Sequence, residues 1–217
     1  MDARNPDHYR PSAIRVAVLS LAALMISACA TTESSRTRAA KIEIQEAVGF
    51  TITEEARISS NVRVDYDQAL KLLEQGEIQQ GIQMLEAVIE VAPGLSAPRI
   101  DLGIAYHIAG NLDAAESNLL LALESNPEHP IAHNELGIVY RKTGRFDAAR
   151  RSYEAALAVY PGYHYARRNL AVLCDLYLAD MSCALDNYEA YLATVPIDDE
   201  ASMWIRDLRY RMGQGER

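Results

Sequence analysis

Two stretches of the chain, 34 residues apart, repeat each other and limit what the chain can fold into. LGIAYHIAGNLDAAE at residues 102–116 and LGIVYRKTGRFDAAR at residues 136–150 are identical at eight of fifteen positions. A fixed period of this length is typical of an array in which each unit is a pair of antiparallel helices. One such unit cannot bury its own apolar face, so neighbouring units have to stack. We therefore expect an all-α solenoid.

The recurring residues resemble the pattern of the tetratricopeptide repeat (TPR). That pattern places small residues where the two helices of a unit touch, aromatic or large apolar residues between units, glycine in the turn and proline at the end. A unit that starts at Ser96 matches this pattern at Leu102, Gly103, Tyr106, Gly110, Ala115, Leu119, Ala122 and Pro127. A unit that starts at Pro130 matches this pattern at Leu136, Gly137, Tyr140, Gly144, Ala149, Tyr153, Ala156 and Pro161. The resemblance implies about four stacked helix-turn-helix repeats.

Two looser units flank these, and the four together span residues 62–95, 96–129, 130–163 and 164–197. In the first unit Gly81 replaces the usual alanine, and in the fourth the register slips by one residue around the turn LADMS. Residues 198–217 are expected to form a capping helix and tail, because Asp198 or Asp199 can cap a helix whose apolar residues recur at helical spacing. We expect Trp204 to be buried against the fourth unit.

The N-terminus reads as a leader rather than as part of the fold. Three arginines precede VAVLSLAALMI at residues 16–26, a run of eleven apolar or small residues that is too short for a permanent membrane span. The following ISAC at residues 26–29 resembles the bacterial lipobox, in which the cysteine thiol is acylated and the chain is cut before it. We therefore expect residues 1–28 to be a lipoprotein signal peptide and Cys29 to carry the lipid. An ordinary cleaved signal with an incidental cysteine, and an uncleaved anchor, are the alternatives.

Residues 29–61 are expected to be a polar tether and a flanking segment. The stretch from residue 41 alternates apolar and polar residues in places, and it is compatible with extended chain or with a short helix before Gly49. Phe50 and Ile52 are candidates for covering the first repeat. Ala30 is not the aspartate that retains lipoproteins at the inner membrane in the lipobox family. That resemblance implies a protein anchored in the outer membrane and facing the periplasm.

The distribution of charge bears on the partners. Removal of residues 1–28 takes away three basic and two acidic groups and changes the formal net charge from −9 to −10. A chain this acidic is expected to repel nucleic acid. Residues 130–170 nevertheless hold seven Lys or Arg against three Asp or Glu. These cations are candidates for contacting an acidic or carboxylate-bearing peptide, and solubilising helix faces are the alternative.

In TPR proteins the first helix of each unit lines a concave groove that receives partner segments. Carried over by repeat position, the resemblance implies a groove that includes Tyr66, Ile104, His107, Asn134, Arg141, Lys142, Tyr165 and Arg168. Some members clamp a terminal carboxylate with an asparagine in the first unit. Leu70 stands at that position here, so this activity is not carried over.

The sequence shows no specific catalytic or cofactor-binding pattern. His129 and His133 are four residues apart, but no carboxylate or cysteine completes a metal set, and we read them as surface histidines. No phosphate-binding glycine loop and no serine elbow is present. Cys174 and Cys183 are candidates for a disulfide across the fourth helix pair, since an oxidising periplasm permits one. Two buried free thiols are the alternative.

These observations predict a non-catalytic, lipid-anchored adaptor that docks peptide segments of envelope proteins without a cofactor. Its resemblance is to TPR lipoproteins that assist pilus or secretin assembly, cell-wall hydrolases, or TonB–ExbB–ExbD-linked machinery, among which repeat motifs do not choose. One alternative is a binder of cell-wall glycan or peptide, or an enzyme, that uses the basic groove. Another is a structural homo-oligomer, and weak self-association is also compatible with the adaptor.

Overall fold

The structure is a computed structural model that describes residues 41–45, 49–53 and 59–213. Its first elements are two antiparallel strands, β1 (Lys41–Gln45) and β2 (Gly49–Thr53), paired from Lys41 opposite Thr53 to Gln45 opposite Gly49. Of the two conformations expected for this segment, the structure has the extended one. The side chains of Phe50 and Ile52, the signal peptide and Cys29 lie outside the part that is described.

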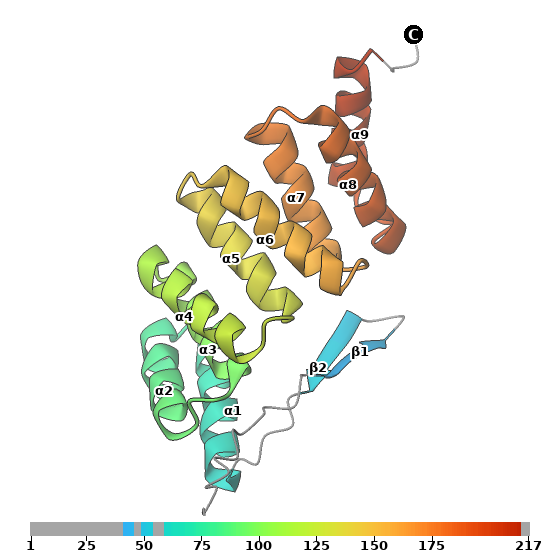
Figure 1. The fold of residues 1–217 in the computed structure, drawn as a ribbon. Coiled ribbons are helices and arrows are strands. Elements are labelled where there is room, and N and C mark those ends of the chain that lie inside the picture. The colour runs from blue at the N-terminus through green and yellow to red at the C-terminus, as the bar shows by residue number, and fades with distance from the viewer. Residues whose placement is uncertain (1–40, 46–48, 54–58, 214–217) are drawn as a thin grey trace, which may run out of the picture. The chain divides into compact units, whose positions relative to one another are not determined.

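Nine helices follow in the described part of the chain, and consecutive helices pack as antiparallel pairs (Figure 1). The pairs are α1 (Ser60–Glu74) with α2 (Ile78–Val91), α3 (Ser96–Ile108) with α4 (Leu112–Ser125), α5 (Pro130–Lys142) with α6 (Phe146–Val159), and α7 (His164–Leu176) with α8 (Met181–Thr194). The last helix, α9 (Asp199–Arg211), packs against α8. The predicted helical solenoid with a capping helix is confirmed, and the strand pair is an addition to it.

The turns inside the pairs explain the period. Three residues join the two helices of each of the first three pairs, and Gly76, Gly110 and Gly144 there have φ of 80°, 82° and 75°, a conformation that glycine adopts at little cost. In the fourth pair four residues, 177–180, join α7 to α8. Accordingly α3, α5 and α7 begin at residues 96, 130 and 164, whereas α9 begins at 199, one residue later than a spacing of 34. The slip predicted from the sequence lies in this turn.

The backbone amides in the first turn of a helix have no acceptor within the helix, and side chains just before several helices accept their hydrogen bonds. The Asn111 side chain accepts a hydrogen bond from the amide of Ala114 at 3.1 Å, and Asp180 accepts from Cys183 at 3.1 Å. Of the two aspartates proposed to cap the last helix, Asp198 does so, accepting from the amide of Ala201 at 2.9 Å.

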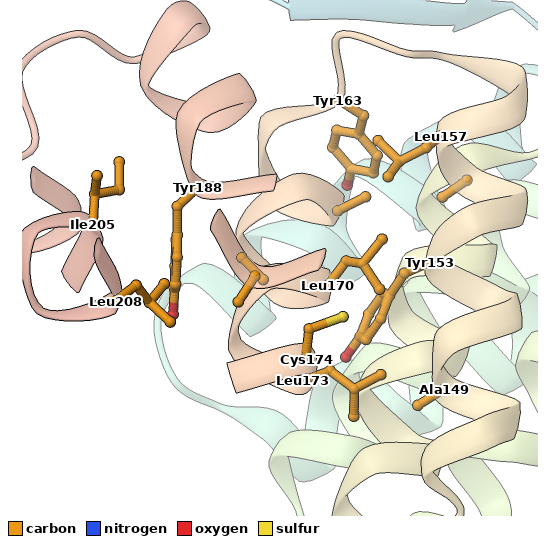
Figure 2. Packing of buried hydrophobic residues seen from close by; sticks show 14 residues of the cluster. Ala149, Tyr153, Leu157, Tyr163, Leu170, Leu173, Cys174, Tyr188, Ile205 and Leu208 are labelled. Atoms are coloured by element: carbon orange, nitrogen blue, oxygen red, sulfur yellow. The ribbon is translucent and has the colours of Figure 1, made fainter. Parts of the chain in front are cut away.

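The core forms between helices, where a small residue on one helix packs against a large side chain on the next. A Cβ added at Gly137 on α5 would lie 2.5 Å from the ring of Tyr153 on α6, so only glycine lets the two helices approach this closely. Figure 2 shows the fully buried Tyr153 beside Leu170 and Cys174 of α7, in a cluster that continues to α9. The expectation for Trp204 was wrong in degree, because this indole is half-buried and packs against Tyr188 with ring centroids 5.2 Å apart. The indole lines a pocket together with Val172 and Asp175 of α7, which keeps part of it accessible.

None of the helices between residues 60 and 211 combines the length and the apolar character needed to cross a membrane.

Candidate docking surface

The first helices of the four pairs form one continuous layer, because α1 contacts α3, α3 contacts α5, and α5 contacts α7. We call the side of this layer that turns away from the second helices the first-helix face. Every residue predicted for the groove belongs to one of these four helices. The structure separates them into groups with different surroundings.

A pocket of about 300 Å³ opens where α1, α3 and the start of α5 meet. We call it the Asp101 pocket, and its lining is Tyr66, Ala97, Ile100, Asp101, Ile104, His129 and Ile131. The predicted groove residues Tyr66 and Ile104 are both here. The Tyr66 hydroxyl donates a short hydrogen bond to Oδ2 of Asp101. Burial raises the pKa of the Asp101 carboxyl, and this hydrogen bond opposes the rise.

A second group, which we call the basic cluster, consists of His107, Arg141 and Lys142. His107 and Arg141 lie one repeat apart in the last turns of α3 and α5, and Lys142 follows Arg141. Burial lowers the pKa of His107, and the charges of Lys142 and Arg141 lower it further. The imidazole therefore stays neutral at physiological pH while the two cations remain. Neither cation forms an ion pair with a carboxylate of the described residues.

The other cations of residues 130–170 are mostly engaged elsewhere. Arg145 pairs with Glu116 through two hydrogen bonds, Arg150 pairs with Asp180 at 2.8 Å, and Arg167 donates to Asn187 at 3.0 Å. Arg151 is exposed on α6, a second helix. Apart from Arg167, Arg141 and Lys142 are thus the cations of residues 130–170 on a first helix that have neither an ion pair among the described residues nor a contact with the capping helix.

Arg168 is engaged with the capping helix. Its guanidinium lies 3.6 Å from Glu200 and 5.3 Å from the ring centre of Trp204, so it joins α7 to the capping helix. The sequence register aims this side chain inward, but the register carries no information about the helix that packs beyond the last repeat.

Asn134 is buried within the helix layer rather than displayed on it. Its amide oxygen accepts from Asn169 of the next repeat at 2.9 Å, and its amide nitrogen donates to Glu135 at 3.0 Å. The bond to Asn169 holds α5 and α7 together. Tyr165, in contrast, is 58% exposed, and its ring lies 4.1 Å from that of His164, so it remains available to a partner.

The two histidines considered for metal binding have structural roles. His129 is buried and caps α5, with Nδ1 accepting from the amide of Ala132 at 3.4 Å, so reading it as a surface histidine was wrong. A ring nitrogen of His133 lies 2.8 Å from the carbonyl oxygen of Pro127. Both residues serve the boundary between the second and third pairs.

Cys174 and Cys183 are joined by a disulfide that closes the fourth pair, which is the first of the two alternatives left open by the sequence. Asp180 lies close enough to both sulfurs to complete a three-donor metal set. However, its carboxylate already accepts from the Cys183 amide and pairs with Arg150, and the sulfurs are bonded to each other. The arrangement is therefore a disulfide crosslink, which we call the covalent clip, rather than a metal centre.

Asp101 is the site residue that the sequence analysis missed. It occupies the position next to Ile100, and the resemblance assigns the neighbouring positions, not this one, to the groove. A usable signal was present, since Asp101 is the one charged residue in the apolar run IDLGIAY at residues 100–106. An acidic residue in such a run is unusual for a helix that packs on both sides.

Comparisons with known proteins agree with this architecture. Family models described as tetratricopeptide repeat match residues 65–136 and 130–163. MamA from Desulfovibrio magneticus RS-1 has a similar structure, with a TM-score of 0.63 and 17% identity over 72% of this chain and 88% of that chain. Pseudomonas aeruginosa PilF gives a TM-score of 0.65 at 18% identity, covering 70% of this chain and 69% of that one. A TPR protein of Thermus thermophilus gives 0.60 at 23% identity, covering 70% and 82%.

No curated protein sequence matches the chain. At these identities the structural likeness establishes the fold alone, and the family models locate the repeats. The protein therefore carries tetratricopeptide repeats within residues 65–163 and folds as a TPR-like solenoid, an architecture that suggests a scaffold for protein–protein interaction.

Proposed function

We propose that the protein is a non-catalytic adaptor that is anchored in the bacterial envelope through an acylated Cys29 and docks acidic peptide segments of envelope proteins on its first-helix face. The observation that carries this proposal is the basic cluster. Arg141 and Lys142 lie in the last turn of α5, one of the first helices, without a carboxylate partner among the described residues, in a chain that is otherwise strongly acidic.

The surroundings of the cluster favour an acidic segment over a single small anion. The Arg141 guanidinium lies 5.8 Å from the ring centre of Tyr177, and its Nε is buried without a hydrogen-bond partner in the described structure. Leu176 and Ile108 are exposed at the ends of the neighbouring helices. Apolar surface beside fixed cations suits a peptide that offers both carboxylates and apolar side chains.

The docking proposal is tested by exchanging Arg141 and Lys142 for glutamine in the full-length protein. We expect the double variant to capture at least about fivefold less of its crosslinked partners from the intact envelope, measured by quantitative mass spectrometry, because two charge pairs are lost. Arg151→Gln is the matched control, since it removes a charge from the second-helix side. Equal losses in both would mean that bulk charge, not the cluster, binds the partner.

Anchoring is tested separately with Cys29→Ala. We expect this variant to leave the membrane fraction while its helical circular dichroism is unchanged, because an acyl chain and not the fold supplies the membrane affinity. Retention in the membrane fraction would reject the lipid anchor and with it the outer-membrane location. The docking experiment would still stand.

A further inference from the structure

The Asp101 pocket contains a carboxylate that no cation of the described structure neutralises. Its hydrogen bond comes from the neutral Tyr66 hydroxyl on Oδ2, and Oδ1 forms none with the described residues. His129, in the same pocket, accepts at Nδ1 from the Ala132 amide, which requires an unprotonated Nδ1. A carboxylate held among three isoleucines without a cation is unfavourable, and a ligand cation would compensate it.

We propose that the Asp101 pocket receives the side chain of a lysine from the docked partner segment, a proposal that rests on the adaptor function above. The ammonium group pairs with Oδ1 of Asp101. The methylene groups lie against Ile100, Ile104 and Ile131, whose side chains line the pocket. The pocket is thus a specificity subsite of opposite charge to the basic cluster.

The geometry favours lysine over arginine. Tyr66 already donates to one oxygen of Asp101, so a guanidinium would have to share that oxygen with the tyrosine to form the paired hydrogen bonds through which it binds most strongly. A single oxygen suits the point charge of an ammonium group. A straight alkyl stem also fits a pocket of about 300 Å³ with apolar walls better than a planar head group does.

The two subsites together define the charge pattern of the partner. Asp101 and His107 lie on the same helix, α3, six residues and therefore about 9 Å apart along its axis. In an extended peptide, residues three positions apart are separated by about 10 Å. The cations Arg141 and Lys142 lie on α5 beside His107. A segment with a lysine and an acidic residue at least three positions apart would therefore reach the Asp101 pocket and the basic cluster at once.

The probe for this inference is n-butylammonium, which has the head group and stem of a lysine side chain. We expect it to shift the methyl resonances of Ile100, Ile104 and Ile131 in a saturable manner in the full-length protein. Asp101→Asn should weaken this binding at least about tenfold, because it removes the charge while keeping an acceptor for Tyr66. Asp67→Asn is the matched control, since Asp67 is an exposed acid on α1 at the equivalent repeat position.

Two outcomes would overturn the inference. One is that 1-butanol shifts the same methyl groups as strongly as n-butylammonium, or that Asp101→Asn binds the ammonium unchanged. The other is that carbodiimide joins Asp101 to Lys41, one of three lysines in the chain, which would make the chain's own segment the occupant. Failure of the docking proposal gives a different result: the variant with glutamine at both Arg141 and Lys142 would keep all its partners, whatever the ammonium titration shows.

Discussion

The third and fourth helix pairs are neighbours in the stack, but they close their turns in different ways. Between α5 and α6 the chain needs three residues, Gly144 takes the positive φ, and the amide of Arg145 donates to the carbonyl of Tyr140 at 2.9 Å. Between α7 and α8 it needs four residues, and the positive φ, 53°, falls on Ala179. The fourth turn is therefore longer and places a side chain where glycine is favoured.

A disulfide and the contacts of Asp180 stabilise the fourth pair around this turn. The disulfide between Cys174 and Cys183 joins the end of α7 to the start of α8, and the Asp180 carboxylate caps α8 and pairs with Arg150 of the third unit. The third pair has glycine in its turn and no disulfide, and both pairs bury a tyrosine of their second helix, Tyr153 or Tyr188. The comparison teaches that equivalent hairpins in one array can share buried packing and differ in whether a covalent bond is added to it.

The largest effect is expected from Tyr153→Ala, which removes the buried ring that packs between the helices of the third pair. Tyr153 is fully buried against Gly137, and its removal leaves a large cavity. We expect the free energy of unfolding to fall by about 3–5 kcal/mol in urea titrations. Tyr165→Ala, which truncates an exposed ring, should cost much less. Similar losses for the two variants would mean that buried packing does not dominate the third pair.

Removing the covalent clip should have the next largest effect. Replacing Cys174 and Cys183 with alanine releases a closed loop of about ten residues, for which chain entropy gives roughly 2–3 kcal/mol. Hydrogen exchange should show the loss of protection in α8 and α9, with α5 and α6 nearly unchanged. If α5 and α6 lost protection equally, the two pairs would unfold as one unit and the comparison would fail.

A smaller effect is expected from exchanging the residues of positive φ. Gly144→Ala should destabilise the third turn by about 1–2 kcal/mol, since alanine disfavours a φ of 75°. Ala179→Gly should stabilise the fourth turn or leave it unchanged, because glycine relieves the strain but adds freedom to the unfolded chain. Both are measured as shifts of the thermal midpoint. A loss of stability in Ala179→Gly would show that Ala179 is not strained.

The smallest effect concerns pH and the Asp180 cap. The pairing with Arg150 and the Cys183 amide hold the pKa of Asp180 below its usual value. Its contribution is therefore complete above the unfolded pKa and is lost as pH falls through the lowered value. Asp180→Asn should cost less than about 1 kcal/mol at neutral pH, since the pair is partly exposed, and the difference should vanish in acid. A difference that persisted at low pH would assign the effect to shape rather than charge.

Much of the helical architecture follows from local signals, and the gaps have physical reasons. The starts of α3, α5 and α7 at Ser96, Pro130 and His164 follow from a period that glycines and prolines mark in the sequence. The contacts of Arg168 and Asn134 do not follow from this period. Their partners, Glu200 and Asn169, lie on other helices, about 30 residues away or more. The repeat pattern specifies which residues face a neighbour and leaves open which polar partner that neighbour supplies.

The extra residue in the fourth turn has a consequence for how such an array can lengthen. Segments 96–129 and 130–163 begin their helices at the same phase, so an unequal crossover between them would return a chain with one more interchangeable module. A copy of residues 164–198 would instead repeat the longer turn and the disulfide, with a step of 35 residues. Duplication of the middle segments therefore preserves the 34-residue period, whereas duplication of the fourth pair would not.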